Sequence, residues 1–377
     1  MEDGDETDGY EQDTGRRKTM EEGKQSLTNE ISAVLIRWYE IHRRELPWRE
    51  TTDPYRIWIS EIILQQTRVA QGLEYYLRFV NRFPDVKSLA GAHEDEVMKL
   101  WQGLGYYSRA RNLHAAAREV SGKYAGLFPA DYASVRALKG IGDYTAAAIC
   151  SFAFGLPHAT VDGNVYRVLA RLYGLDTPVD TPAGKREFAA LAGSLLDPAR
   201  AGLHNQAMME FGALQCVPRS PDCTVCPLAG RCAALRQGRV DDLPVKAGRT
   251  EVKPRYFNYL HLRCDGRTVL VKRTGSDIWR NLYEFPLLET GTPVAFDVLR
   301  DDPRFRALLG GTEYAVLHRV AMPKHQLSHR TIHACFYEIE VEAFPHPLPP
   351  DGCVVADGEV SDYAVSRLTE LYLQRRG

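Results

Sequence analysis

The chain of 377 residues is 44% hydrophobic and 25% charged, with a formal net charge of −2. These are the proportions of a globular protein, and the length favours two domains. No apolar run approaches the ~18 residues of a membrane helix and the N-terminus is acidic, so we expect no membrane span, no secretory signal and a cytoplasmic location. Residues 1–25 hold nine acids and four bases, have almost no large apolar side chains and are expected to be disordered. The remainder is slightly basic, which is too weak a signal to indicate nucleic acid by itself.

A helical pattern begins at Ser26, and a second helix is predicted over residues 55–71. Glu61 lies on the apolar face of this second helix, because it is four residues from Ile57 and three from Leu64. A glutamate in this position has two interpretations. It is either a snorkelling or capped side chain, or a buried carboxyl whose raised pKa keeps a proton available for general acid catalysis.

The pattern stays helical as far as a cysteine-rich loop. Further helices are predicted at Tyr75–Arg82, Glu94–Leu100, Tyr107–Val120, Tyr132–Leu138, Arg186–Leu196 and Gln206–Leu214. A glycine-hinged loop, residues 103–109, carries Tyr106 and is followed by basic Arg111. This loop is either a helix connection with a core tyrosine, or an aromatic wedge beside phosphate-binding arginines.

Residues 138–164 combine a glycine turn with a later carboxylate. Gly140 and Gly142 precede a run of small apolar residues that is typical of a helix. Backbone N–H groups freed by glycine at a helix N-terminus form an anion site, although such turns also serve as plain connections. Asp162 comes at the start of the next helix, whose dipole favours the ionised carboxylate. The segment therefore predicts a phosphate clamp about twenty residues before a fixed anion.

Four of the eight cysteines fall within seventeen residues, spaced by six, two and five intervening positions. This clustering indicates a metal or cluster site rather than disulfides. Zinc ribbons usually show two CxxC pairs, but spacing alone leaves zinc and an iron–sulfur cubane open. The four are Cys216, Cys223, Cys226 and Cys232, and the other cysteines are expected to fill cores.

Residues 236–253 are polar and non-periodic, and read as a linker. The sequence then changes to alternating strands with a hairpin turn, which predicts a second domain of α+β type. Its expected elements are strands at Tyr256–Cys264, Thr268–Val271 and Arg330–Val341, the turn at Asp265-Gly266, and helices near Phe296–Leu309 and Glu359–Arg375.

Together these pieces resemble the endonuclease III superfamily of helix-hairpin-helix DNA glycosylases, and within it the MutY-type adenine DNA glycosylases. The matching segments occur in the family's order over residues 26–235: Leu46-Pro47-Trp48-Arg49, Ser60-Glu61 with Gln65-Gln66-Thr67, Gly103-Leu104-Gly105-Tyr106-Tyr107, Leu138-Lys139-Gly140-Ile141-Gly142, Val161-Asp162-Gly163-Asn164-Val165, Asn205 to Glu210, and the four-cysteine loop.

The resemblance implies a mainly α catalytic region followed by an α+β, Nudix-like C-terminal domain. The catalytic region, residues 26–235, comprises a six-helix barrel over about 48–156 and a cluster module from 26–47 and 157–235. The linker 236–253 leads to a lesion-recognition domain, residues 254–377. This domain lacks the Nudix box, so pyrophosphate cleavage is not expected. The implied cofactor is one [4Fe-4S] cluster held by the four clustered cysteines.

The family implies a role for each catalytic residue type. Hydrolysis of an N-glycosidic bond needs a proton for the base and an anion for the sugar cation. Glu61 resembles the acid, Asp162 the anion, and Asn164 the residue that positions the aspartate and water. Bifunctional relatives carry a lysine just before Thr145, which forms a Schiff base. Here it is Tyr144, which cannot do so; it is expected to hydrogen-bond to Asp162 or to be a packing tyrosine.

The remaining implied site residues bind DNA. They are the base pocket (Trp48, Arg49, Glu210), the residues that fill the emptied stack or hold the strand (Gln66, Thr67, Tyr106, Gly140, Gly142, Thr145) and the lesion-probing loop (Leu327, Ser328, His329). Leu327 stands where the family has phenylalanine, and the segment also reads as a polar strand turn. Arg219 and Arg231 are either phosphate contacts or ordinary solvated charges.

The expected activity is therefore monofunctional removal of adenine opposite 8-oxoguanine or guanine in duplex DNA, with the base flipped out. We expect a nucleoid-associated monomer. The alternatives are an endonuclease III-like bifunctional enzyme for oxidised pyrimidines, and a DNA-binding module without catalysis.

Overall fold

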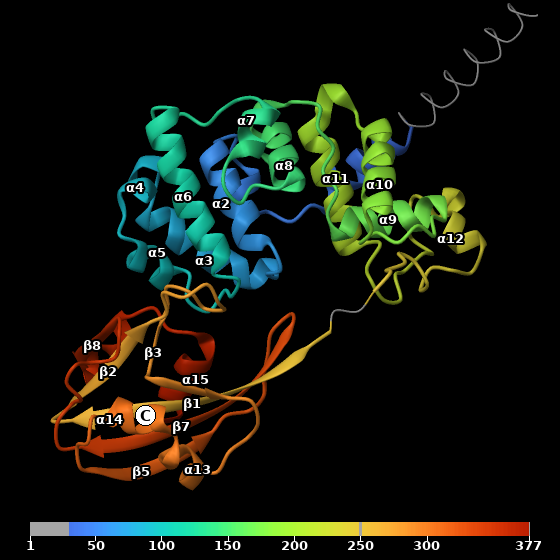
Figure 1. Ribbon diagram of the computed structural model, residues 1–377. Coiled ribbons are helices and arrows are strands. Elements are labelled where there is room, and N and C mark those ends of the chain that lie inside the picture. The colour runs from blue at the N-terminus through green and yellow to red at the C-terminus, as the bar shows by residue number, and fades with distance from the viewer. Residues whose placement is uncertain (1–29, 249–250, 377) are drawn as a thin grey trace, which may run out of the picture. The chain divides into compact units, whose positions relative to one another are not determined.

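The computed structural model describes residues 30–248 and 251–376, so the predicted acidic tail lies outside the described residues. By its internal contacts the chain divides into two compact units (Figure 1). The first combines the described residues up to Gln65 with Tyr124–Gly248, and the second combines Gln66–Lys123 with the residues from Arg249 onwards. Helices of the predicted barrel, residues 48–156, therefore belong to both units.

The described residues of the first unit form helices and loops and contain no strand. Residues 30–42 form a helix. The later elements are η1 (Pro47–Arg49), α2 (Pro54–Leu64), α7 (Tyr132–Ala137), α8 (Asp143–Phe154), α9 (Gly163–Tyr173), α10 (Pro182–Leu195), η2 (Pro198–Arg200), α11 (Ala201–Leu214), η3 (Ala229–Arg231) and α12 (Ala233–Arg236).

Helix α8 is central in this unit. Its residues Thr145 to Ser151 are all buried, and it packs against α2, α7 and α11. Small alanines at the contact let these helices approach closely. Helix α9 packs against α10, α11 and α12 around a second apolar core that includes Leu169, Phe188 and Phe211. These contacts bring the ends of α2, α8 and α9, which carry the predicted chemistry, into one unit.

The second unit begins with four helices, α3 (Val69–Arg82), α4 (Val86–Gly91), α5 (Glu94–Leu100) and α6 (Ser108–Lys123). Helix α6 packs against α4 and α5. Asp85 and Ser88 form a reciprocal capping box at the start of α4, a short helix that the sequence interpretation did not predict.

The rest of this unit is a mixed sheet of order β3-β2-β1-β7-β5, in which β4 also pairs with β1, β6 with β7 and β8 with β2. The strands are β1 (Lys253–Cys264), β2 (Arg267–Lys272), β3 (Tyr283–Glu284), β4 (Leu287–Thr290), β5 (Tyr314–Ala321), β6 (His325–Gln326), β7 (Arg330–Val341) and β8 (Gly352–Ala356). The central pair, β1 and β7, is parallel, with Lys253 opposite Arg330 and Arg263 opposite Glu340.

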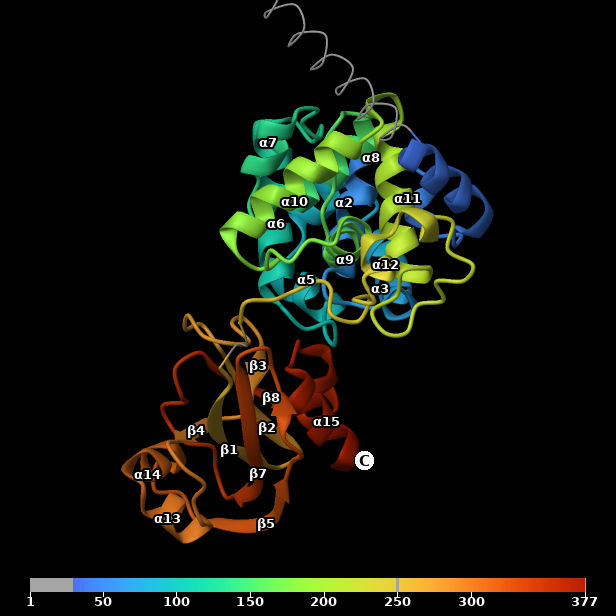
Figure 2. The ribbon, with the colours of Figure 1, turned by 90° about the vertical axis from the view of Figure 1, so that its right-hand side faces the viewer.

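Helices lie on both faces of the sheet (Figure 2). Side chains alternate between two cores, one on each face. On one face Tyr259 and Phe336 stack with Tyr372 of α15 (Arg367–Arg376), which follows η4 (Asp357–Asp362). On the other face Leu260 and Tyr337 pack with residues of α13 (Phe296–Asp301) and α14 (Pro303–Leu309). The sheet is therefore covered by helices on both faces.

Two predicted helices are interrupted. The helix expected over 55–71 ends at Leu64, because Gln66 has a left-handed backbone with φ 59°, and α3 starts afresh at Val69. The helix expected near Phe296–Leu309 is broken at Asp302, which caps α14 ahead of Pro303. The predicted strand Arg330–Val341 and the hairpin turn at Asp265-Gly266 are confirmed, since both turn residues have positive φ.

Candidate active site

Glu61 projects from α2 into the interior of the first unit and is only 7% exposed. The hydroxyl of Tyr144, in the first turn of α8, donates a 2.6 Å hydrogen bond to Oε2 of Glu61. Burial raises the pKa of Glu61 to about 7, against the opposing hydrogen bond from Tyr144, and the charge of Asp162 raises it further. At neutral pH a substantial fraction of this carboxyl keeps its proton, so the buried interpretation of Glu61 holds.

Tyr144 was expected to bond Asp162, and this expectation is corrected: its partner is Glu61. Burial and the neighbouring Glu61 carboxyl hold the pKa of Tyr144 well above its usual value, so the phenol stays a hydrogen-bond donor. The position at which bifunctional enzymes need an amine therefore carries a neutral hydroxyl.

Asp162 is the N-cap of α9 and is bonded very differently from Glu61. Its Oδ1 accepts from the backbone N–H groups of Asn164 at 2.9 Å and Val165 at 2.8 Å, and its Oδ2 accepts from the Asn164 amide at 2.8 Å. Burial raises the pKa of Asp162, and these three hydrogen bonds oppose the rise because they stabilise the carboxylate. The side chain is thereby fixed in one orientation, with Asn164 as its support.

A buried arginine extends this arrangement toward the cysteine loop. Arg167 donates to the Asn164 side-chain oxygen at 2.9 Å, to the Gly212 carbonyl at 2.6 Å and to the Cys216 carbonyl at 2.7 Å. A Cβ at Gly212 would lie 2.6 Å from the Cβ of Asn164, so α11 approaches the start of α9 only with glycine there. The sequence interpretation missed Arg167. This residue follows Gly163, the first residue of α9, by about one helical turn, so it lies near Asp162 at the start of the helix.

Glu210 was predicted to line a base pocket with Trp48 and Arg49. The structure buries Glu210 to 1% exposure and commits both its oxygens to arginines: Arg44 at 2.8 and 2.5 Å, and Arg49 at 2.9 and 2.8 Å. Burial alone would raise the pKa of Glu210, but the arginine hydrogen bonds outweigh it and hold the pKa at about 2. Glu210 thus anchors the segment that carries Trp48 and Arg49, and Arg44 is a second partner that sequence spacing did not reveal.

The hairpin residues divide into two exposed glycines, Gly140 and Gly142, and the buried Thr145. Gly140 has φ 82°, and Gly142 is the N-cap of α8 with no side-chain cap, so the first N–H groups of α8 face no capping side chain. This arrangement fits the predicted phosphate clamp. Thr145 is instead buried, and its hydroxyl accepts a 3.2 Å hydrogen bond from Gln65, so it ties α8 to the end of α2.

The four clustered cysteines line one small cavity with Arg171. Arg171 is 2% exposed, reaches Cys216 Sγ at 3.4 Å and donates to the Val217 and Pro218 carbonyls at 2.8 and 3.0 Å. Within the described residues, no three His, Cys, Asp or Glu side chains stand close enough to hold one metal ion. Four thiols around one cavity are a donor set that suits either a single zinc ion or an iron–sulfur cluster.

The residues of the predicted lesion-probing loop lie in the second unit. Tyr106 is 50% exposed, has a left-handed backbone with φ 47°, and its hydroxyl is 2.7 Å from Oγ of Ser328. A cavity of about 470 Å³ lies between them, and its lining includes Tyr106, Trp279, Leu327, Ser328 and His329. The structure therefore brings the predicted loop and the predicted aromatic wedge together. Gln66 and Thr67 precede α3 and do not line this cavity.

The helical fold with its hairpin and buried acid defines a base-excision DNA glycosylase. Residues 59–191 match the model of the HhH-GPD superfamily of base excision DNA repair proteins, and residues 258–375 match the NUDIX domain. Over 57% of this chain and 98% of the other, the fold is similar to a thermostable thymine-DNA glycosylase, with TM-score 0.53 and 28% identity. No helix of the described residues is long and apolar enough to cross a bilayer.

The chain belongs to the adenine DNA glycosylase family. It is 32% identical to the adenine DNA glycosylase of Buchnera aphidicola from Baizongia pistaciae over 302 residues, which cover 80% of this chain and 83% of the relative. It is 40% identical to the human adenine DNA glycosylase over 218 residues, or 55% of this chain and 40% of the human protein.

Proposed function

We propose that this protein is a monofunctional DNA glycosylase that releases adenine paired with 8-oxoguanine or guanine in duplex DNA. The observation that carries the proposal is the buried Glu61, with a pKa near 7 and Tyr144 as its hydrogen-bond donor. A departing adenine needs a proton, and a carboxyl that is half protonated at neutral pH can supply it. The known activity of the family's members supports the choice of base.

The two carboxyl groups take different parts in this reaction. Glu61 delivers its proton to the adenine ring as the glycosidic bond breaks, and Tyr144 holds the Glu61 carboxylate that results. Asp162, held ionised by the N-terminus of α9 and by Asn164, stabilises the positive charge that develops on the sugar. Asn164 also orients the water that completes hydrolysis.

Strand cleavage is not expected. A bifunctional enzyme forms an imine between a lysine and the sugar, and the corresponding group here is the phenol of Tyr144. This favours the monofunctional reaction over the endonuclease III-like alternative. The two buried carboxyl groups also argue against a module that only binds DNA, which needs no proton donor.

The C-terminal domain is proposed to read the base opposite the adenine. Ser328 and His329 supply hydrogen-bonding groups on the cavity beside Tyr106, and the adenine itself leaves the stack to reach Glu61 and Asp162. The protein is proposed to act as a nucleoid-associated monomer.

One [4Fe-4S] cluster is proposed as the resident cofactor of the loop Cys216–Cys232. Cys216, Cys223, Cys226 and Cys232 would hold it, and Arg171 would face it with a buried positive charge. When bound, the cluster would supply the covalent cross-links that fold a loop otherwise poor in secondary structure.

A labelled duplex that contains adenine opposite 8-oxoguanine tests the function. Free adenine and an intact abasic strand are expected, with no adduct trapped by borohydride. Release of oxidised pyrimidines, or a trapped covalent adduct, would favour the bifunctional alternative and defeat the proposal.

A further inference from the structure

Two loops of the C-terminal domain meet at the cavity beside Tyr106. One is the predicted lesion-probing loop, which contributes Leu327, Ser328 and His329. The other joins β2 to β3 and contributes Ile278 and Trp279, to which sequence interpretation gave no role. The predicted loop has leucine where an aromatic residue was expected, and the second loop places an aromatic residue at the same cavity.

Trp279 is held in an unusual conformation. Its φ is 59°, in the left-handed region that a bulky side chain seldom adopts. Its ring is half-buried and makes an edge contact with Phe257. The centre of the ring lies 6.0 Å from the ring centre of Phe257 and 5.9 Å from that of His325. Trp279 and Leu327 pack on the same apolar core. Such a backbone persists only where the surroundings determine it, and strained positions of this kind gather at binding sites.

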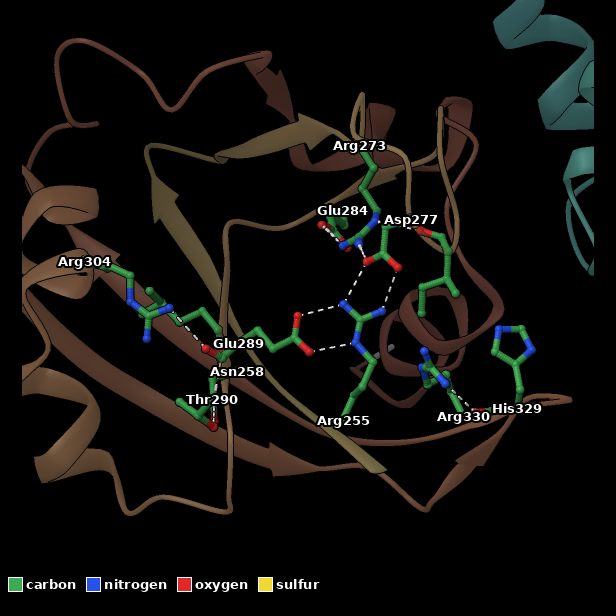
Figure 3. A network of polar contacts seen from close by, with 12 residues as sticks. Arg255, Asn258, Arg273, Asp277, Glu284, Glu289, Thr290, Arg304, His329 and Arg330 are labelled. Atoms are coloured by element: carbon green, nitrogen blue, oxygen red, sulfur yellow. Dashed lines mark hydrogen bonds and ion pairs between the residues drawn. The ribbon is translucent and has the colours of Figure 1, made fainter. Parts of the chain in front are cut away.

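A network of ion pairs surrounds Asp277, in the loop that carries Trp279 (Figure 3). Arg255 of β1 makes two hydrogen bonds to Asp277 at 2.8 and 2.7 Å, and two to Glu289 at 2.7 Å each. Arg273 bonds Asp277 at 2.8 Å and Glu284 at 2.6 Å. Asp277, which lies two residues before Trp279, therefore accepts hydrogen bonds from two arginines. Bidentate pairs fix orientation as well as distance.

The same arginine also holds the main chain directly beside the ring. Nε of Arg273 donates to the carbonyl of Ile278 at 3.0 Å, and the backbone N–H of Arg273 donates to the carbonyl of Leu282 at 2.9 Å. The Asn281 N–H donates to the Arg273 carbonyl at 2.7 Å, which closes the loop on itself. The loop is thus rigid on both sides of Trp279, as a preorganised contact requires.

We propose that Trp279 is a specificity-determining residue whose indole ring contacts the base opposite the excised adenine, with Asp277 and Arg255 as its positioning residues. This inference rests on the proposed function. Ser328 and His329 provide polar contacts to that base, while the ring provides the aromatic surface that Leu327 does not. Contact between a base and an aromatic side chain is worth about five- to a hundredfold in affinity, so a ring that meets one base and not the other can set much of a preference.

The test measures the preference of the full-length protein for 8-oxoguanine over guanine. Duplexes carry a non-hydrolysable 2′-fluoro adenosine analogue opposite either base, and the ratio of the two dissociation constants is the readout. Trp279→Leu is expected to lower this ratio about tenfold, and Trp279→Phe by about threefold or less. Leu327→Phe added to Trp279→Leu is expected to restore most of the preference.

Two further variants separate positioning from general stability. Asp277→Asn breaks the pairing with Arg255 and Arg273 and should lower the ratio in the same direction. Asp302→Asn, a matched control, breaks an ion pair with Arg304 in α14 and should leave the ratio unchanged. If circular dichroism shows that Trp279→Leu is misfolded, Leu327→Phe in the wild-type background is the deciding variant. It is expected to change the ratio of dissociation constants less than twofold, because an aromatic surface is already present.

Three results would overturn the inference. They are an unchanged ratio in folded Trp279→Leu, an equal loss of affinity for both duplexes, and a tenfold gain in preference from Leu327→Phe alone. A wild-type protein that shows no adenine release and no preference for 8-oxoguanine would instead defeat the proposed function itself, so the two failures are distinguishable.

Discussion

Removing the hydroxyl of Tyr144 should move the pH dependence of adenine release toward higher pH. Glu61 acts in its protonated form, so the rate is full below its pKa of about 7 and falls as pH rises through that value. The hydrogen bond from Tyr144 stabilises the ionised form and so lowers the pKa of Glu61. In Tyr144→Phe the pKa of Glu61 rises, and the enzyme keeps its activity to higher pH.

The size of the shift follows from the geometry. A 2.6 Å hydrogen bond to a carboxylate that is 7% exposed is not screened by solvent. Hydrogen bonds to charged groups contribute about 1.5–3 kcal/mol, and 1.36 kcal/mol corresponds to one pKa unit. We therefore expect the descending limb of the profile to move up by about one to two pH units.

Single-turnover release of adenine, measured from about pH 5.5 to pH 9.5 with enzyme in excess, gives the profile directly. Tyr173→Phe serves as the control, because that phenol lies in the same unit and its pKa is raised by burial alone. A Tyr144→Phe profile that stays in place, or moves to lower pH, would refute the assignment of Glu61 as the acid supported by Tyr144.

The other predictions concern the acid, the ion-pair anchor, the link to the cysteine loop and the cofactor. Glu61→Gln should abolish adenine release while binding of the same duplex persists, and appreciable turnover would contradict the acid role. Glu210→Gln leaves two arginines without their carboxylate and should lower the free energy of unfolding, measured in urea, by about 3 kcal/mol. In the wild type this stability is lost as pH falls from about 4.5 toward 2, and the variant should lack that pH dependence. Arg167→Met should slow release at least tenfold with little change in duplex affinity, since it frees Asn164. Iron and acid-labile sulfide should each amount to about four per chain and fall in Cys226→Ser, whereas stoichiometric zinc without iron would overturn the cluster proposal.

Local pattern was sufficient to predict the apolar surroundings of Glu61 and the helix start at Asp162. The three- and four-residue spacing around Glu61 predicted an apolar helix face, and the structure buries this carboxyl. Asp162 was expected at a helix start, and it caps α9. The alternation from Arg330 to Val341 gave a strand with the observed ends. In each case the signal extends over fewer than about twenty residues, which is the range over which periodicity and capping act.

Contacts between distant segments were not predictable in this way. Tyr144 and Glu61 are 83 positions apart, and which carboxyl receives the phenol depends on how α8 packs against α2. Arg44 and Glu210 are 166 positions apart, and neither neighbourhood indicates the other. The break at Gln66 was missed for a different reason: a non-glycine residue with positive φ carries no sequence signature.

The division of labour between the two carboxyl groups follows from their hydrogen bonds rather than from their burial. Both are desolvated, and desolvation raises the pKa of each. Asp162 receives three hydrogen bonds, two of them from the N-terminal backbone of α9, whereas Glu61 has a single described donor, the phenol of Tyr144. At about 1.5 kcal/mol or more for each bond to a charged group, two additional bonds favour ionisation of Asp162 over Glu61 by about 3 kcal/mol. Once Asp162 is ionised, its negative charge further raises the pKa of Glu61. The hydrogen bonds therefore favour the charge on Asp162 and the proton on Glu61, which is the arrangement that the proposed protonation of a base and stabilisation of a sugar cation require.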